Sequence, residues 1–415
     1  MNLDYREVEN MDQPKLRFPQ YINEWKKCTL ASLIIDKPKN GFSPEPVNYK
    51  TDFPVLSISA VTTGTFRGEH CKYTDCNIDK DAQCWVKNED ILIQRSNTAE
   101  FVGVSAIYEG EDNKYIYPDL LMKIHAKNGI NSKFLSCYLI TPNIRQYYKK
   151  NACGTSGNMP KINQKTVLNT PLYITEVGEQ NRIAELMSRI DKRIENQRLI
   201  IEDWEAKKRG IIQKLFKQEV KFKQENGNTY PQWKNVKLSE LLSERKTKAI
   251  KDGSYEHVSL TKEGVVPKTA QYNRDFLVMS DDKEYKITKM NDICYNPANL
   301  KFGVICRNTY GEGIFSPIYI TFEVTEKNVP EFVEIMVTRA DFINYALRYQ
   351  EGTVYERMAV SPEDLLGIEV KIPCEEEQRK IAKCISVLNK KIEIEKKILS
   401  DWNDIKKALL QQMFV

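Results

Sequence analysis

Two stretches of the chain, residues 179–216 and 377–414, place apolar residues at alternating spacings of four and three. This heptad pattern predicts two long helices that pair along an apolar seam as an antiparallel coiled coil. The seam of the first helix contains Ile183, Met187, Ile190, Ile194, Ile201 and Trp204. The seam of the second contains Ile381, Ile385, Leu388, Ile392, Leu399 and Trp402.

Polar residues interrupt both seams at equivalent layers, Gln197 and Lys208 in the first helix and Glu395 and Lys406 in the second. Such residues cost stability but fix the register and orientation of the pair. About 37 residues at roughly 1.5 Å each make a helix of about 55 Å, long enough to act as a spacer between two domains. The alternative is that each amphipathic helix packs separately on its own domain.

The two helical stretches belong to an internal repeat, because Glu179 recurs as Glu377, 198 positions later. The residues that recur identically at this distance are Glu179, Gln180, Ile183, Ala184, Ser188, Lys192, Ile194, Glu195, Ile200, Asp203, Trp204, Lys208, Gln213 and Phe216. The repeat extends upstream, where Asp90-Ile91 matches Asp292-Ile293 after a small change of register. A long internal period of this kind decides the architecture before any other feature.

The repeat predicts an α+β chain with two mixed α/β globular domains, residues 1–175 and 219–373, each followed by a long helix, residues 176–218 and 374–415. Short β-rich runs lie among turns rich in Gly, Asn and Asp, at residues 54–58, 90–93, 120–124 and 318–322. The best candidates for short helices are residues 132–139 and 330–337.

Composition adds limits rather than a function. The net charge of +5 is a mild basic bias that many proteins without a nucleic-acid partner share. No run approaches the eighteen or so apolar residues of a membrane span, and residues 1–10 lack an apolar signal core, so a cytoplasmic location is expected. None of the ten cysteines forms a Cys-x-x-Cys pair, so free thiols are expected.

Catalytic and metal-binding patterns are missing from the sequence. The nearest approach to a metal cluster, His70 with Cys71, Cys76 and Cys84, matches no zinc spacing, so no bound metal is expected. There is no phosphate-binding glycine loop, no His-Glu-x-x-His and no Gly-x-Ser-x-Gly. These absences favour a binding protein over an enzyme.

Two segments in each half combine turns with the polar and basic residue types that bond phosphates and base edges. In the first half the candidate DNA contacts are Gln94, Arg95, Ser96, Asn97, Lys149, Lys150, Thr155, Ser156 and Asn158. In the second half they are Asn296, Asn299, Lys301, Thr353, Tyr355 and Arg357. For any single residue, a merely solvated loop is the alternative. A shared scaffold with different loops nevertheless suits two readers of different sequences.

The organisation resembles that of type I restriction-modification specificity subunits over essentially the whole chain. The resemblance is carried by the helix openings EQNRIA and EQRKIA, by the Gly-Thr pairs at 154–155 and 352–353, and by the lead-ins PLYITEVGEQ and IEVKIPCEEEQ. The domain openings LRFPQY and VKFKQENGNTYPQW are also similar to those of the family.

The resemblance implies that each globular domain is a target-recognition domain that reads one half of a split double-stranded DNA sequence. It also implies two partner modification subunits that use S-adenosylmethionine to methylate adenine, and restriction subunits that use ATP and Mg to translocate and cut DNA. This chain itself would bind no cofactor and catalyse no reaction. The alternatives are a fused or stand-alone DNA restriction enzyme and a coiled-coil scaffold without DNA affinity.

Overall fold

The computed structural model describes residues 13–154, 159–249, 254–262, 264–268, 284–351 and 358–415. These residues form two compact units, each of which is described separately. Unit 1 contains residues up to Ile200 together with Glu395–Val415, and unit 2 contains Ile201–Ile394. Each unit therefore includes a globular domain and parts of both long helices.

Unit 1 is built on a four-stranded antiparallel sheet in the order β2 (Lys39–Asn40), β7 (Leu121–Ile124), β5 (Ile91–Gln94), β6 (Ser105–Ile107). Two-stranded sheets pair β1 (Lys26–Thr29) with β8 (Pro171–Ile174) and β3 (Pro54–Leu56) with β4 (Cys71–Tyr73). The short helices are α1 (Leu30–Leu33), α2 (Ser132–Leu139), α3 (Pro142–Asn151) and α4 (Gln164–Leu168), with a 3₁₀ turn at Ile58–Ala60.

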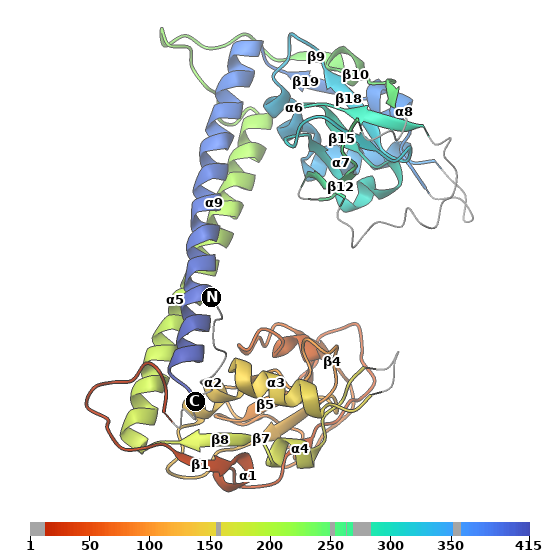
Figure 1. The fold of residues 1–415 in the computed structure, drawn as a ribbon. Coiled ribbons are helices and arrows are strands. Elements are labelled where there is room, and N and C mark those ends of the chain that lie inside the picture. Colours follow the sequence, from red (N-terminus) through yellow and green to blue (C-terminus); the bar gives the residue numbers. More distant parts are fainter. Residues whose placement is uncertain (1–12, 155–158, 250–253, 263, 269–283, 352–357) are drawn as a thin grey trace. The chain divides into compact units, whose positions relative to one another are not determined.

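The sequence of β5 explains why it lies at the centre of unit 1. All four of its residues are buried, and a run of branched apolar side chains suits a strand that is covered on both faces. One face, with Ile91 and Ile93, packs under α2 and α3 (Figure 1). The other face, with Leu92, packs against a separate cluster around Tyr117. The helix α2 begins where Asn131 Oδ1 accepts a hydrogen bond from Phe134 N at 2.9 Å, a standard N-cap.

Unit 2 repeats this plan. Its four-stranded sheet has the order β10 (Leu242–Glu244), β18 (Ile320–Val324), β15 (Ile293–Tyr295), β16 (Ile305–Arg307), and β9 (Lys234–Lys237) pairs with β19 (Glu369–Ile372). Additional pairings join β11 (Lys248–Ala249), β14 (Tyr285–Thr288) and β17 (Gly313–Phe315), and join β12 (Val258–Leu260) to β13 (Val265–Pro267). The helices are α6 (Pro330–Val337), α7 (Ala340–Ala346) and α8 (Pro362–Gly367), with 3₁₀ turns at Leu238–Glu240, Pro297–Phe302 and Leu347–Tyr349.

The long helices are α5 (Val177–Phe216) and α9 (Glu375–Gln412). Within unit 1 the two helices run in opposite directions. Asp191 of α5 contacts Lys406 of α9 at 2.7 Å. Gln197, which follows Asp191 along α5, contacts Glu395, which precedes Lys406 along α9, at 2.5 Å. Apolar residues at seam positions are buried or half-buried in both units. Five apolar residues of the same helices that lie outside the seam are at least 40% exposed, namely Leu199, Ile200, Val387, Ile394 and Ile405.

The expected elements agree closely with the observed ones. The helices expected at 132–139 and 330–337 are α2 and α6, and the four expected β-rich runs overlap β3, β5, β7 and β18, with ends displaced by up to two residues. The chain thus has mixed helix and sheet content in both units.

Candidate nucleic-acid interface

The buried glutamate that opens each long helix attaches it to the globular domain. Glu179 is fully buried and accepts hydrogen bonds from Trp25 Nε1 at 3.1 Å and from Arg17 Nε at 2.7 Å. The hydrogen bond from Arg17 to this carboxylate raises the pKa of the guanidinium. In unit 2, Trp233 Nε1 donates to Glu377 Oε2 at 3.1 Å, and burial raises the pKa of that carboxyl.

The glutamine that follows has the same structural role in both units. Gln180 Oε1 accepts a hydrogen bond from Asn131 N at 2.9 Å, and its Nε2 donates to Thr175 O at 2.7 Å. Gln378 Oε1 likewise accepts from Val329 N at 2.9 Å, and its Nε2 donates to a backbone carbonyl of the preceding lead-in at 3.1 Å. The repeated Glu-Gln pair therefore holds the start of a helix against the loop that precedes α2 or α6.

An aromatic side chain near the end of a long helix completes the core of each unit. The ring of Phe414 lies 5.0 Å from Tyr138, 5.3 Å from Phe134 and 6.4 Å from Trp25, measured between ring centroids. In unit 2, Phe216 is stacked on an aromatic ring of α6 at 5.6 Å and lies edge-on to a tryptophan at 5.4 Å. Each domain is consequently held by one helix beginning and one helix end.

In the first half, the candidate contacts at the end of β5 are mostly internal. Gln94 is fully buried, and its Nε2 donates to Ile58 O at 3.1 Å and to Thr62 Oγ1 at 2.8 Å. Asn97 Nδ2 donates to Gln94 Oε1 at 2.8 Å, and Ser96 is also buried. These bonds indicate that Gln94 and Asn97 position the loop, whereas the half-buried Arg95 is the member of this segment with side-chain surface to offer.

The other candidates of the first half divide in two. Lys149 and Lys150 are exposed in the last turn of α3, where cations also favour the helix dipole. Thr155, Ser156 and Asn158 lie outside the described residues.

In the second half, Asn296 is buried and caps the 3₁₀ turn at Pro297–Phe302, with its Oδ1 accepting from Ala298 N at 3.1 Å. Asn299 is half-buried, and Lys301 is exposed with its Nζ 5.1 Å from the ring centroid of Phe302. Thr353, Tyr355 and Arg357 lie outside the described residues.

The structure brings the two candidate segments of each half together. In unit 1, Ser96 forms a β-bridge with Lys161, which also bridges Cys153 within the second segment. In unit 2, Val360 N donates to Pro297 O at 3.4 Å, beside a bridge between Glu351 and Ala359. Both units thus place a β-strand end next to a loop that follows the short helices.

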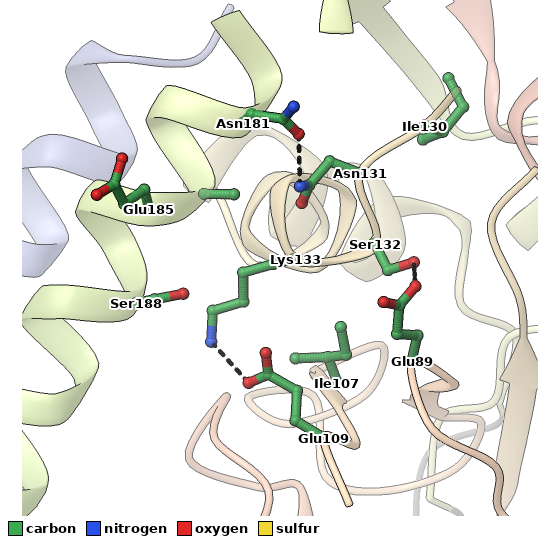
Figure 2. Close-up of a pocket in the computed structure, with 11 residues that line it drawn as sticks. Glu89, Ile107, Glu109, Ile130, Asn131, Ser132, Lys133, Asn181, Glu185 and Ser188 are labelled. Atoms are coloured by element: carbon green, nitrogen blue, oxygen red, sulfur yellow. Dashed lines mark hydrogen bonds and ion pairs between the residues drawn. The ribbon is translucent and has the colours of Figure 1, made fainter. Parts of the chain in front are cut away.

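A cavity of about 510 Å³ lies between the globular domain of unit 1 and α5. Figure 2 shows Lys133 pointing toward Glu109, 3.6 Å away, and Ser132 donating to Glu89 at 2.9 Å. With Glu185 on the α5 side, three carboxylates and one lysine line this cavity. This surplus of negative charge does not suit a phosphate.

Within the described residues, no group of three or more His, Cys, Asp or Glu side chains could hold a metal ion. No helix in the same ranges is sufficiently long and apolar to cross a membrane.

Comparison with known families gives the class of the protein. Residues 22–203 match the family model described as the type I restriction modification DNA specificity domain. The matched segment runs from the approach to β1 through the first 27 residues of α5, so it includes the Glu179 attachment and the β5 loop. This part of the chain therefore resembles a DNA specificity domain of type I restriction-modification systems.

Similarity to individual proteins extends this result over the chain. The type I restriction enzyme MjaX specificity subunit of Methanocaldococcus jannaschii is 25% identical, over 98% of this chain and 96% of that protein. The EcoEI specificity subunit of Escherichia coli is 23% identical over 38% of this chain and 27% of that protein. Over nearly its whole length the chain is therefore similar to specificity subunits of type I restriction enzymes.

Solved structures share the fold. A crystal structure of a type I restriction-modification S subunit from M. genitalium aligns with a TM-score of 0.52 at 17% identity, covering 97% of this chain and 99% of that chain. A chain from a study of complex assembly and conformational transition of the type I R-M system aligns with a TM-score of 0.53 at 14% identity, covering 94% and 97%.

The functions of several residues in this region could not be predicted from the sequence. Glu179 and Gln180 were identified only as residues that recur 198 positions later, and that recurrence was the available signal for a shared structural role. Arg145, which lies under the β5 loop and donates to Glu100 O at 2.8 Å, carries no signal in the sequence.

Proposed function

We propose that the two globular domains are target-recognition domains, each of which reads one half of a bipartite double-stranded DNA sequence. The observation that carries this proposal is the repeated plan of the two units: the same sheet order, the same helix attachment and different loop side chains after β5 and β15. Two copies of one scaffold with divergent loops are suited to two different short sequences.

The long helices would act as an antiparallel coiled-coil spacer that sets the length of the unread gap. Support comes from the opposite directions of α5 and α9 in unit 1 and from the burial of seam residues in both units. In unit 1 the two polar layers pair with specific partners, since Gln197 bonds Glu395 and Lys406 bonds Asp191. Such polar contacts favour one register over its neighbours.

Recognition by two linked readers would exceed recognition by either one. A second domain that is held on the same spacer binds at high effective concentration once the first is bound. Lysine and arginine contacts to phosphates would supply the salt-dependent part of the affinity, while bidentate contacts to base edges would add about 1–3 kcal/mol each. Two modification subunits using S-adenosylmethionine, and restriction subunits using ATP and Mg, would carry out methylation and cleavage at the chosen site.

The test is to delete one heptad from each helix, residues 197–203 of α5 and 389–395 of α9, and to map methylated sites in a host that expresses the chain with its modification subunit. Seven residues shorten a helix by about 10.5 Å, or about three base pairs of DNA. We expect the half-sites to keep their sequences and the gap to shorten by about that amount. An unchanged gap would refute the spacer role.

A second measurement separates the alternatives. The purified chain with modification subunits should bind target duplex with an affinity that falls with salt, which a scaffold without DNA affinity would not do. The chain alone should neither cut nor methylate the same duplex.

A further inference from the structure

A second cavity in unit 1, of about 330 Å³, lies where the globular domain meets both long helices. The domain contributes the Thr62–Thr65 turn and the start of α3, and the helices contribute residues of α5 and α9. Its polar and charged lining residues are Thr62, Thr63, Thr65, Arg145, Arg198, Asn403, Lys406 and Lys407.

The charge of this cavity is opposite to that of the cavity in Figure 2. Four of its lining residues are cations, and none of the described residues that line it is a carboxylate. Of the four, Lys406 is paired with Asp191 at 2.7 Å, while the ion-pair partner of Arg198 within the described residues is the exposed Glu195 at 3.6 Å. Exposed pairs of this kind contribute little and leave the cation available to another anion.

Arg145 adds a half-buried positive charge. Its guanidinium donates to Val102 O at 2.5 Å and to Glu100 O at 2.8 Å, and within the described residues it has no ion pair with a carboxylate. Burial lowers its pKa to about 10, which still leaves the group charged at neutral pH. A half-buried cation without a counter-ion has lost part of its hydration, and a bound anion would offset that loss.

The remaining lining groups are also suited to phosphate oxygens. Hydroxyl and amide side chains are common donors to phosphate. Thr62 is held in place because its Oγ1 donates to Ile58 O at 3.0 Å and accepts from Gln94 Nε2 at 2.8 Å. The buried Gln94 therefore fixes one wall of the cavity.

The internal repeat retains the positive charge on the helices. At a distance of 198 residues, three of the four cations are matched by another cation, as Arg198 and Lys396, Lys406 and Lys208, and Lys407 and Arg209. Only Lys406 and Lys208 occupy seam layers, so helix pairing does not require the other two positions to be basic.

We propose that this cavity binds a phosphate group of the DNA backbone at the flank of the half-site that the first recognition domain reads. Arg198 and Lys407 would donate hydrogen bonds to the phosphate oxygens, and Arg145 would supply positive charge from the side of the globular domain. The inference rests on the proposed function and adds to it, since the spacer helices would then contact DNA as well as separate the readers.

The experiment uses the full chain with its modification subunits and a duplex that contains the mapped target. Affinity is measured against NaCl concentration for the wild type, for the double variant R198Q/K407Q and for the control R193Q/K397Q. The control removes the same charge from exposed positions of the same two helices that do not line the cavity. Loss of the one phosphate contact should reduce the slope of log affinity against log salt by about 0.9. Across a fourfold rise in salt, the wild type should lose about 3.5-fold more affinity than R198Q/K407Q.

Duplexes with neutral methylphosphonate linkages at the flank test the position of the contact. They should reduce the slope for the wild type and the control but not further for R198Q/K407Q. Equal slopes for both double variants would overturn the cavity proposal and leave the proposed function standing. Wild-type complex that binds target and unrelated duplex alike would instead refute the proposed function.

A free phosphate is the other source of the same chemistry. Inorganic phosphate and ATP are therefore titrated into the complex without DNA, with binding followed by calorimetry. Binding that R198Q/K407Q abolishes, together with unchanged salt slopes, would assign the cavity to a free phosphate compound and overturn the DNA assignment.

Discussion

Replacement of Phe414 by alanine should destabilise unit 1, although this residue lies about 240 positions after the last strand of its globular domain. Its side chain is only 5% exposed. Its ring contacts Trp25, which directly precedes β1, and two aromatic rings of α2. Truncation of a buried phenylalanine to alanine costs about 3–5 kcal/mol, because both the transfer energy and the contacts across the new cavity are lost. For a unit of this size, that corresponds to a decrease of about 6–20 °C in Tm.

The assay is hydrogen exchange combined with urea unfolding, because exchange resolves the two units. Protection of the amides of α2 should fall in Phe414→Ala, while that of α6 stays unchanged. Phe414→Leu, which keeps most of the volume, should lose less than about 1.5 kcal/mol. The matched variant Phe216→Ala should reverse the pattern, with α6 affected and α2 spared. Unchanged α2 protection in Phe414→Ala would refute the placement of this helix end in the core of unit 1.

Two further predictions concern single polar residues. Gln94→Ala should lower the free energy of unfolding by about 1–3 kcal/mol, because it leaves buried partners unpaired. Arg95→Ala should lower DNA affinity with little change in the urea midpoint of unfolding. If Gln94→Ala instead lowered DNA affinity and Arg95→Ala lowered stability, the roles given to the two residues would be wrong. Because burial raises the pKa of Glu377, its folded form holds a proton more tightly, so the stability from this group is present below the ordinary value of 4.5 and is lost as pH rises through the raised pKa. Glu377→Gln can still accept a hydrogen bond from Trp233 but cannot ionise, so its unfolding midpoint should fall less than that of the wild type as pH rises through the raised pKa. The same dependence of the unfolding midpoint on pH in both proteins would contradict the role given to Glu377.

The long helices and the repeated plan could be predicted from the sequence because they rest on periodicity. Seam residues such as Met187 recur at heptad spacing, and burial follows from that spacing whatever the surroundings. The short helices α2 and α6 were also predicted with their observed bounds.

The candidate interface was less predictable, because polar composition does not distinguish a side chain that binds a ligand from one that holds a loop. Gln94 and Asn296 have the residue types of DNA contacts, but both are buried and bonded to their own domain. The sequence also did not indicate that Lys406 forms an ion pair with Asp191. Burial opposes ionisation of Asp191, but Lys406 and Lys133 outweigh it and lower its pKa, and these cations come from distant parts of the sequence.

The contribution of Glu395–Val415 to unit 1 has a consequence for synthesis of the protein. On the ribosome, residues 201–394 emerge before the segment that completes the earlier unit, so the later unit can finish folding first. Until Met413 and Phe414 leave the exit tunnel, the first globular domain cannot complete its core, and part of its aromatic cluster stays exposed to solvent. Termination of translation before Met413 would therefore damage the domain that is translated earlier.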